Sequence, residues 1–226
     1  MPPTAGHCFP LDEYRKVVDS TASATFPQQG VSCVYGILGY WLENVDKPKD
    51  AQEEGVWAKN DILDEQVFEK NGAYRKSVAD LNLLTYLIRH GDAHDEQFLI
   101  TKDRQSPRVY SVDNSIAFQS IKNPMLIFRE DWSFIQVPAV SKNSVERLGA
   151  VSRDRWASLE VIEQYERRGS ELVAVAPTGV IGPRDAGLRW FGVGLQIGLT
   201  EGEIAGVRDR LKDLLGDVKS GDVKTF

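Results

Sequence analysis

Long apolar runs are missing from this chain of 226 residues, and no stretch approaches the roughly 20 residues that a helix needs to span a bilayer. The sequence therefore predicts no membrane span. The first residues, MPPTAGHCFPLDEY, also lack the basic-then-apolar order of a secretion signal. Together these two absences predict a cytoplasmic protein.

Basic residues are fewer than acidic residues in this chain. The chain has 27 Lys and Arg against 33 Asp and Glu, which gives a formal net charge of −6 and a pI near 5.2. A broad grip on nucleic acid or on anionic lipid needs a basic face, which this composition does not imply. We therefore expect no nucleic-acid partner.

Cysteine is scarce as well, since Cys8 and Cys33 are the only two. They could form at most one bridge, and in a chain this long such a pair is typical of incidental buried thiols rather than of a disulfide-stapled scaffold. The 42% of hydrophobic residues is enough to bury a substantial core without such staples. We therefore expect an ordinary globular protein with two free thiols.

Apolar residues at helical spacing predict helices at several places. These lie near residues 11–20, at 60–71 and 77–89, in one or two segments within 144–169, and from Thr200 onward. Ser77 with Asp80, and Thr200 with Glu203, resemble capping boxes at the starts of two of these helices. Residues 31–44 are rich in β-branched and aromatic side chains and favour a strand. The Gly-rich segment 171–198 fits either strands or irregular packing.

An antiparallel hairpin is predicted in the middle of the chain. Residues 98–100 and 109–112 favour strands, and the sequence TKDRQSPR between them has turn chemistry. If the turn centres near residue 105, Gln97 faces Asp113, and Asp92 lies in the loop that leads into the first strand. Oxygen ligands would then meet at one end of the hairpin, where they could hold a divalent cation such as Mg²⁺.

The order of these residues resembles that of kinase-like phosphotransferases. HGDAHDEQ (90–97) is similar to the catalytic loop H-x-D-x-x-x-x-N, with Gln97 in place of Asn. VDNSIAF (112–118) is similar to the metal-binding motif in its Asp-Asn-Gly form, which replaces Asp-Phe-Gly in atypical branches. The nearest resemblance is to type II phosphatidylinositol 4-kinases and secretory-pathway casein kinases, with aminoglycoside phosphotransferases further away. It covers about residues 31–118, where YGILGYWLEN is similar to the hinge strand.

The resemblance implies an α+β, protein-kinase-like fold in a single domain, 1–226. Residues 1–45 would form a reduced N-terminal lobe with the hinge-like strand, and residues 46–226 a mainly helical C-terminal lobe that carries the catalytic hairpin. Asp92 would orient or deprotonate the acceptor hydroxyl, whereas Gln97 and Asp113 would bind the nucleotide through its metal. The implied cofactors are ATP and Mg²⁺, with Mn²⁺ as an alternative. The acceptor could be a protein, a lipid or a small molecule.

Two other functions stand beside active phosphotransfer. About 30 residues precede the hinge-like strand, and they contain no G-x-G-x-x-G loop and no strand Lys to pair with phosphates, which favours a pseudokinase that binds nucleotide or a partner protein without turnover. A metal-dependent hydrolase rests on His90 and His94, four residues apart, and has only His7 as a further imidazole. We expect His90 instead to pack beneath the loop and to orient the peptide near Asp92.

Overall fold

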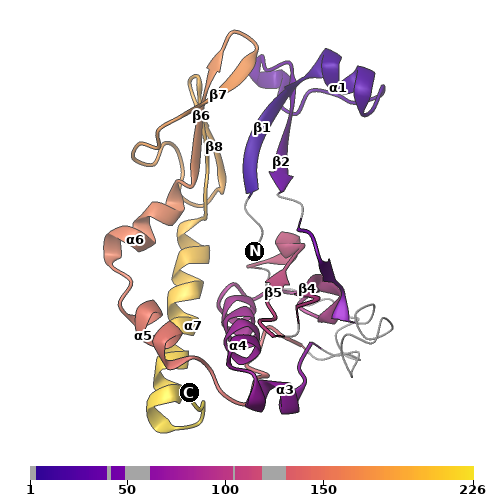
Figure 1. Ribbon diagram of the computed structural model, residues 1–226. Helices are drawn as coiled ribbons and strands as arrows, with labels where there is room; N and C mark the ends of the chain where they lie inside the picture. The colour runs from indigo at the N-terminus through magenta and orange to yellow at the C-terminus, as the bar shows by residue number, and fades with distance from the viewer. Residues whose placement is uncertain (1–3, 40–41, 49–61, 104, 119–130) are drawn as a thin grey trace. The chain divides into compact units, whose positions relative to one another are not determined.

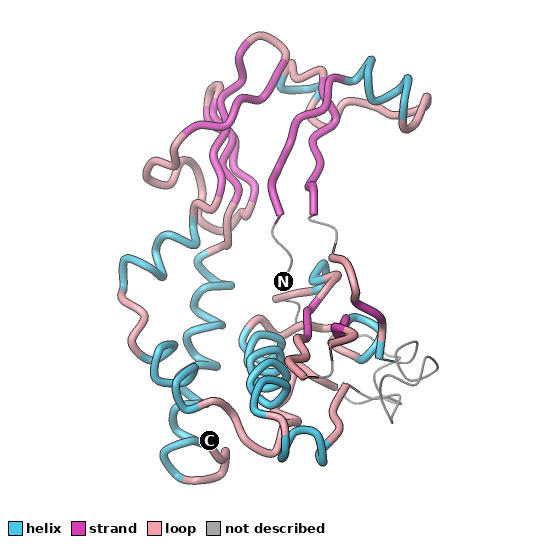
Figure 2. Tube along the Cα trace, in the orientation of Figure 1, coloured by secondary structure: helices cyan, strands magenta, loops and turns pink. Residues whose placement is uncertain are grey.

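The computed structural model describes residues 4–39, 42–48, 62–103, 105–118 and 131–226 (Figure 1). Helices and small antiparallel sheets confirm the α+β class (Figure 2). The chain forms two compact units, the first mainly from residues 41–151 and 206–226, the second from residues 3–40 and 152–205. This division differs from the expected one at residue 45, because residues 152–205 join the N-terminal segment.

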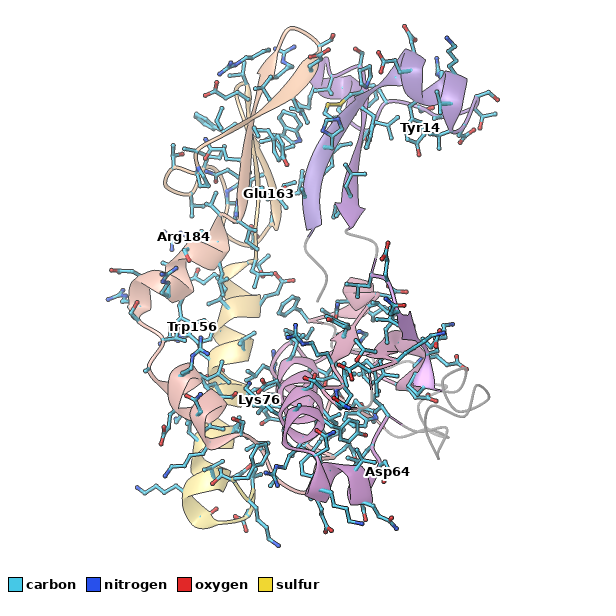
Figure 3. All side chains as sticks on the ribbon, in the orientation of Figure 1. Tyr14, Asp64, Lys76, Trp156, Glu163 and Arg184 are labelled. Carbon is cyan, nitrogen blue, oxygen red and sulfur yellow. A yellow bond between two sulfur atoms is a disulfide. The ribbon has the colours of Figure 1, made fainter. Side chains whose placement is uncertain are left out.

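Helices α3 (Glu65–Lys70), α4 (Gly72–Leu87) and α5 (Lys142–Gly149) and most of α7 (Glu201–Ser220) belong to the first unit. Each of these four helices starts at a polar capping residue. Asp64, labelled in Figure 3, caps α3 by accepting hydrogen bonds from two backbone N–H groups. Asn71 caps α4 in the same way, at the N–H groups of Ala73 and Tyr74.

The predicted helix start at Ser77 is therefore wrong by five residues. Ser77 lies inside α4, where its hydroxyl accepts a hydrogen bond from the backbone N–H of Val109 at 2.8 Å. Asp80, its expected capping partner, forms an ion pair with Lys76 and accepts a hydrogen bond from the Ser144 hydroxyl at 2.6 Å. The two polar side chains thus connect α4 to the hairpin and to α5, rather than capping the start of a helix.

A three-stranded sheet completes the first unit, with the order β3 (Val45–Asp46), β4 (Phe98–Thr101) and β5 (Val109–Ser111). The hairpin of β4 and β5 confirms the prediction for these residues. The largest buried side chains that belong to this unit are Trp132, Tyr74, Phe98, Ile62, Leu83 and Leu214. Phe98 of β4 packs edge-on against Trp132, which anchors the hairpin in the core.

In the second unit, β1 (Thr4–Pro10) pairs with β2 (Cys33–Gly39), and α1 (Leu11–Val17) follows β1 directly. The α1 and β2 predictions are confirmed, whereas β1 was not predicted. Cys8 and Cys33 form a disulfide, so the expectation of two free thiols is wrong. Disulfides are rare in cytosolic proteins, and this bond weighs against the expected cytoplasmic location. Among the described residues, none of the helices combines the length and the apolar character that a bilayer crossing requires.

A four-stranded antiparallel sheet forms the rest of the second unit, after α6 (Arg153–Ala157). Its strands, in spatial order, are β7 (Glu171–Val175), β6 (Glu163–Arg168), β9 (Gly194–Ile197) and β8 (Leu188–Phe191). The prediction of a helix that ends at Gly169 is thus wrong over residues 163–168. Segment 171–198, for which the sequence fits either strands or irregular packing, contains strands. The expectation that residues 46–226 are mainly helical fails over these four strands.

Polar residues inside this sheet explain the wrong assignment. Gln164, Gln196 and Arg189 are register partners on β6, β9 and β8, and all three are buried. The Gln196 amide donates to the Gln164 side-chain oxygen at 2.8 Å and accepts a hydrogen bond from the N–H of Ile181. Because inward-facing positions of this sheet carry polar side chains, the alternation of apolar and polar residues that marks a strand is hidden in the sequence.

A carboxylate joins the two sheets of the second unit. Glu163, labelled in Figure 3, accepts hydrogen bonds from the hydroxyls of Tyr35 at 3.0 Å and Tyr165 at 2.8 Å, and from the N–H of Gly6 at 3.3 Å. Burial is the main cause that raises the pKa of Tyr35 above its ordinary value. A Cβ atom at Gly6 would overlap both hydroxyls, so a larger residue at this position would displace the two tyrosine side chains.

Removal of the disulfide should destabilise the second unit. The bond closes a loop with a sequence separation of 25 residues, and a loop of this size corresponds to about 3.5 kcal/mol in the chain-entropy account. We expect the double variant Cys8→Ala, Cys33→Ala to unfold at a lower urea concentration by circular dichroism. A reducing agent should shift the wild type in the same direction and leave the double variant unchanged. An unfolding curve of the wild type that is the same with and without the reductant would contradict the presence of the disulfide.

Candidate functional site

The loop that carries Asp92 begins where α4 ends. Arg89 adopts a left-handed conformation, with φ of 46°, and turns the chain out of the helix. The N–H of His90 bonds back to the Thr85 carbonyl at 3.0 Å. Arg210 of α7 donates from Nε to the Leu87 carbonyl at 2.7 Å, which satisfies one of the carbonyl groups left open at the helix end. The start of the loop is thus fixed by α4 and α7 together.

His90 lies fully buried beneath this loop and connects it to the segment after β5. Its Nδ1 accepts a hydrogen bond from the backbone N–H of Asp92 at 3.2 Å, so the proton of the neutral ring is on Nε2. Nε2 lies 3.2 Å from the backbone carbonyl of Asp113 and can donate to it. Burial lowers the pKa of His90, which favours this neutral form. The expectation that His90 orients the peptide near Asp92 is confirmed.

Two backbone hydrogen bonds add to this link. The Gly91 N–H donates to the Ile116 carbonyl at 2.9 Å, and the Phe118 N–H donates to the Ile88 carbonyl at 2.7 Å. Together with the His90 ring, they hold the loop at 88–93 beside the turn at 113–118. The two sequence motifs that were compared with kinase motifs are therefore adjacent in space.

The carboxylate of Asp92 has a side-chain neighbour at each of its oxygens. The Gln97 amide donates from Nε2 to Oδ2 at 3.3 Å, and Nε2 of His94 lies 3.4 Å from Oδ1. The side chain of Asp92 is 14% exposed, so it is mostly withdrawn from water yet reachable from outside. A partly buried carboxylate held at both oxygens can accept a proton from a substrate hydroxyl in a fixed geometry.

The hairpin register differs by one residue from the predicted one. Phe98 pairs with Ser111 and Ile100 with Val109, and the Val112 N–H donates to the Gln97 carbonyl at 3.0 Å. Gln97 therefore faces Val112, and the prediction that it faces Asp113 is wrong. The difference arises because the loop between the strands centres half a residue earlier than residue 105. Asp113 remains the next residue along the chain.

Asp113 follows β5 in a left-handed conformation, with φ of 50°. Asp tolerates this region better than most residues because its short polar side chain can bond locally. The next residue, Asn114, accepts a hydrogen bond from the hydroxyl of the buried Ser111 at 2.7 Å. The structure connects Asp113 to the Asp92 loop through its backbone carbonyl, by way of His90.

A buried asparagine holds the segment that supports this loop. Asn82 of α4 is fully buried and bonds to four backbone groups: the carbonyls of Trp132 and Phe134 and the N–H groups of Gln136 and Val137, at 2.7–3.2 Å. The Trp132 N–H in turn donates to the carbonyl of Ala93, next to Asp92, at 3.0 Å. Sequence reasoning did not single out Asn82, because its partners lie about 50 residues away.

The two histidines of the loop do not form a paired metal site. Both ring nitrogens of His90 face backbone groups, and Nδ1 of His94 accepts a hydrogen bond from the Glu96 N–H at 3.2 Å. In the part of the chain that the structure describes, no group of three or more His, Cys, Asp and Glu side chains is arranged to hold a metal ion. This geometry counts against a hydrolase with two histidine ligands.

Of the three predicted site residues, the structure brings the side chains of Asp92 and Gln97 into contact and connects Asp113 to their loop through its backbone carbonyl. It adds His94 beside Asp92. The contact of His94 with Asp92 was missed, although its position two residues after the aspartate was a signal. Comparison with protein-family models finds no match for the chain, and a search of curated proteins finds no significant match.

Proposed function

We propose that the protein transfers the terminal phosphoryl group of ATP to a hydroxyl acceptor, with Mg²⁺ or Mn²⁺ as the metal. The observation that carries the proposal is the carboxylate of Asp92, which is largely buried and held at both oxygens, next to the turn that contains Asp113. The catalytic power of phosphoryl transfer comes almost entirely from positioning and charge stabilisation. A rigid carboxylate beside a hairpin that offers oxygen ligands suits that task.

Asp92 is the proposed base. An ionised carboxylate has about four acceptor positions, of which the Gln97 amide uses one and the His94 ring faces another. A substrate hydroxyl that binds beside this carboxylate passes its proton to it as the hydroxyl oxygen attacks the γ-phosphorus. The nucleoside diphosphate is the leaving group, and the proton on Asp92 is then returned to solvent.

Asp113 and Gln97 would hold a magnesium ion that is bound largely by phosphates. Mg²⁺ favours oxygen ligands, keeps several waters and commonly takes only one or two protein carboxylates beside the phosphates, so it does not require a cluster of three acidic side chains. Asp113 would supply the carboxylate and Gln97 its amide oxygen. The metal would neutralise charge on the β- and γ-phosphates.

A nucleotide-binding pseudokinase is the second candidate, and one observation favours it. In addition to the missing Gly-rich loop and strand Lys, the Gln97 amide already bonds to the proposed catalytic carboxylate at 3.3 Å. An amide that stays on the carboxylate competes with the acceptor hydroxyl. Nucleotide binding without any ADP formation is the result that would distinguish this candidate from the enzyme.

Metal-dependent nucleotide binding should be lost when Asp113 is changed. We expect Asp113→Ala to lower the affinity for ATP with Mg²⁺ at least tenfold in calorimetric titrations, because the substitution removes the only carboxylate assigned to the metal. Titrations without divalent metal should show weak binding for both proteins.

Asp103→Ala is the matched control, since it removes the same charge from the turn of the same hairpin. Asp103 caps that turn by accepting from the N–H groups of Gln105 and Ser106. We expect its ATP affinity to match that of the wild type. Absence of ATP binding to the wild type with either Mg²⁺ or Mn²⁺ would refute the proposed function.

A further inference from the structure

His94 is held in one tautomer by the backbone of its own loop. Its Nδ1 accepts a hydrogen bond from the N–H of Glu96 at 3.2 Å, and a backbone N–H can only donate. Nδ1 also lies 3.7 Å from Oδ1 of Asp95, and in a neutral imidazole the bond from Glu96 places the proton on Nε2. This nitrogen lies 3.4 Å from Oδ1 of Asp92, so the ring presents its N–H side to the carboxylate.

Burial makes this arrangement rigid. His94 as a whole is 8% exposed, and its ring begins the 3-10 turn Asp95–Gln97 as the capping side chain. The same turn ends at Gln97, whose amide donates to the other oxygen of Asp92. One short turn thus supplies a side chain to each oxygen of the carboxylate.

From this geometry we propose that His94 is a positioning residue for the catalytic carboxylate, an inference that rests on the proposed phosphotransfer. The ring fixes the rotation of the Asp92 carboxylate through its Nε2–H, while Gln97 fixes the second oxygen. The carboxylate is then held in one orientation toward the substrate hydroxyl. His94 itself touches neither nucleotide nor acceptor.

Two substitutions separate this role from a structural one. His94→Asn keeps a polar atom at the position of Nδ1, so it retains the cap on the Glu96 N–H but loses the donor to Asp92. His94→Gln places an amide N–H near the position of Nε2, so it retains the donor but loses the cap. A positioning role makes His94→Gln the more active variant, whereas a capping role makes His94→Asn the more active one.

We expect His94→Asn to lower kcat about 10- to 100-fold, the cost of a misplaced catalytic group, with KM for ATP unchanged within twofold. His94→Gln should retain kcat within about threefold, in line with the same principle. Both are measured as ADP formation with ATP and Mg²⁺. The reverse order of the two variants, or equal kcat values, would overturn the inference.

A second readout does not depend on turnover. Long-range ¹H–¹⁵N spectra should show the Nε2–H tautomer of His94 in the wild type, and Asp92→Ala should shift the Nε2 resonance while Asp113→Ala leaves it in place. An Nδ1–H tautomer, or an Nε2 resonance that does not shift in Asp92→Ala, would overturn the positioning role. If the wild type forms no ADP, the proposed function fails, and these spectra still decide whether His94 holds Asp92.

Discussion

Asp92→Asn should lower the rate of phosphoryl transfer about 10³-fold, within the usual range for loss of a general base. The amide cannot take up the proton of the acceptor hydroxyl, but it has nearly the size and shape of the carboxylate. Affinity for ATP with Mg²⁺ should stay within threefold of the wild type, because the substitution leaves in place both residues proposed to bind the metal, Asp113 and Gln97. The measurement is ADP formation at saturating ATP, combined with a calorimetric titration.

Asp103→Asn is the matched control, since it makes the same change of charge in the turn of the hairpin that follows the loop. Asp103 accepts hydrogen bonds from the N–H groups of Gln105 and Ser106, and it is assigned no part in the chemistry. We expect its rate to stay close to that of the wild type. Equal losses in both variants would mean that the charge of the loop and hairpin matters, rather than a base at position 92.

Asn82→Ala should destabilise the first unit by about 3 kcal/mol or more. The substitution leaves the carbonyl of Phe134 and the N–H groups of Gln136 and Val137 without their side-chain partner, and an unsatisfied buried group costs about 1–3 kcal/mol. Urea unfolding followed by circular dichroism measures the loss. Turnover should also fall, because the same segment bonds to Ala93 beside Asp92.

Asn71→Ala is the control for this substitution. It removes an asparagine that caps the same helix, at the edge of the unit rather than in its core, and such a cap contributes about 1 kcal/mol. If Asn82→Ala lowers the free energy of unfolding by no more than Asn71→Ala does, the buried asparagine does not stabilise the unit in the way described.

Local signals in the sequence predicted the elements that depend on local interactions. Thr200 and Glu203 form the predicted reciprocal capping box, in which each side chain bonds to the backbone N–H of the other residue. The hairpin of β4 and β5 follows from its turn residues and its β-branched strands. The start of α4 was missed because the chain offers two capping residues, and the Ser77 hydroxyl is engaged by Val109 of the distant hairpin.

Features that depend on distant partners could not be predicted from one sequence. The disulfide needs the pairing of β1 with β2, which brings Cys8 and Cys33 to a Cα separation of 5.5 Å. The four-stranded sheet hides its strand pattern, because Gln164 and Gln196 occupy buried positions and satisfy each other. In both cases the decisive contact joins residues that are 25 or more positions apart.

The sequence identified the segments that carry the candidate site but not the contacts within them. The spacing of Asp92, Gln97 and Asp113 identified the loop and the hairpin. The one-residue register difference and the contact of His94 with Asp92 depend on how the loop and turn fold, which composition and spacing do not specify. The structure changes the role of His94 from a candidate metal ligand to a neighbour of the proposed base.

The most direct test of the central claim, that this loop and hairpin hold a nucleotide through a divalent metal, is paramagnetic relaxation by Mn²⁺. In ¹H–¹⁵N spectra of the wild type with ATP, substoichiometric Mn²⁺ should broaden the amide signals of Gln97, Asp113 and Asn114 first, and Asp113→Ala should abolish this selectivity. Broadening that begins elsewhere in the chain, or that is the same with and without ATP, would contradict the account.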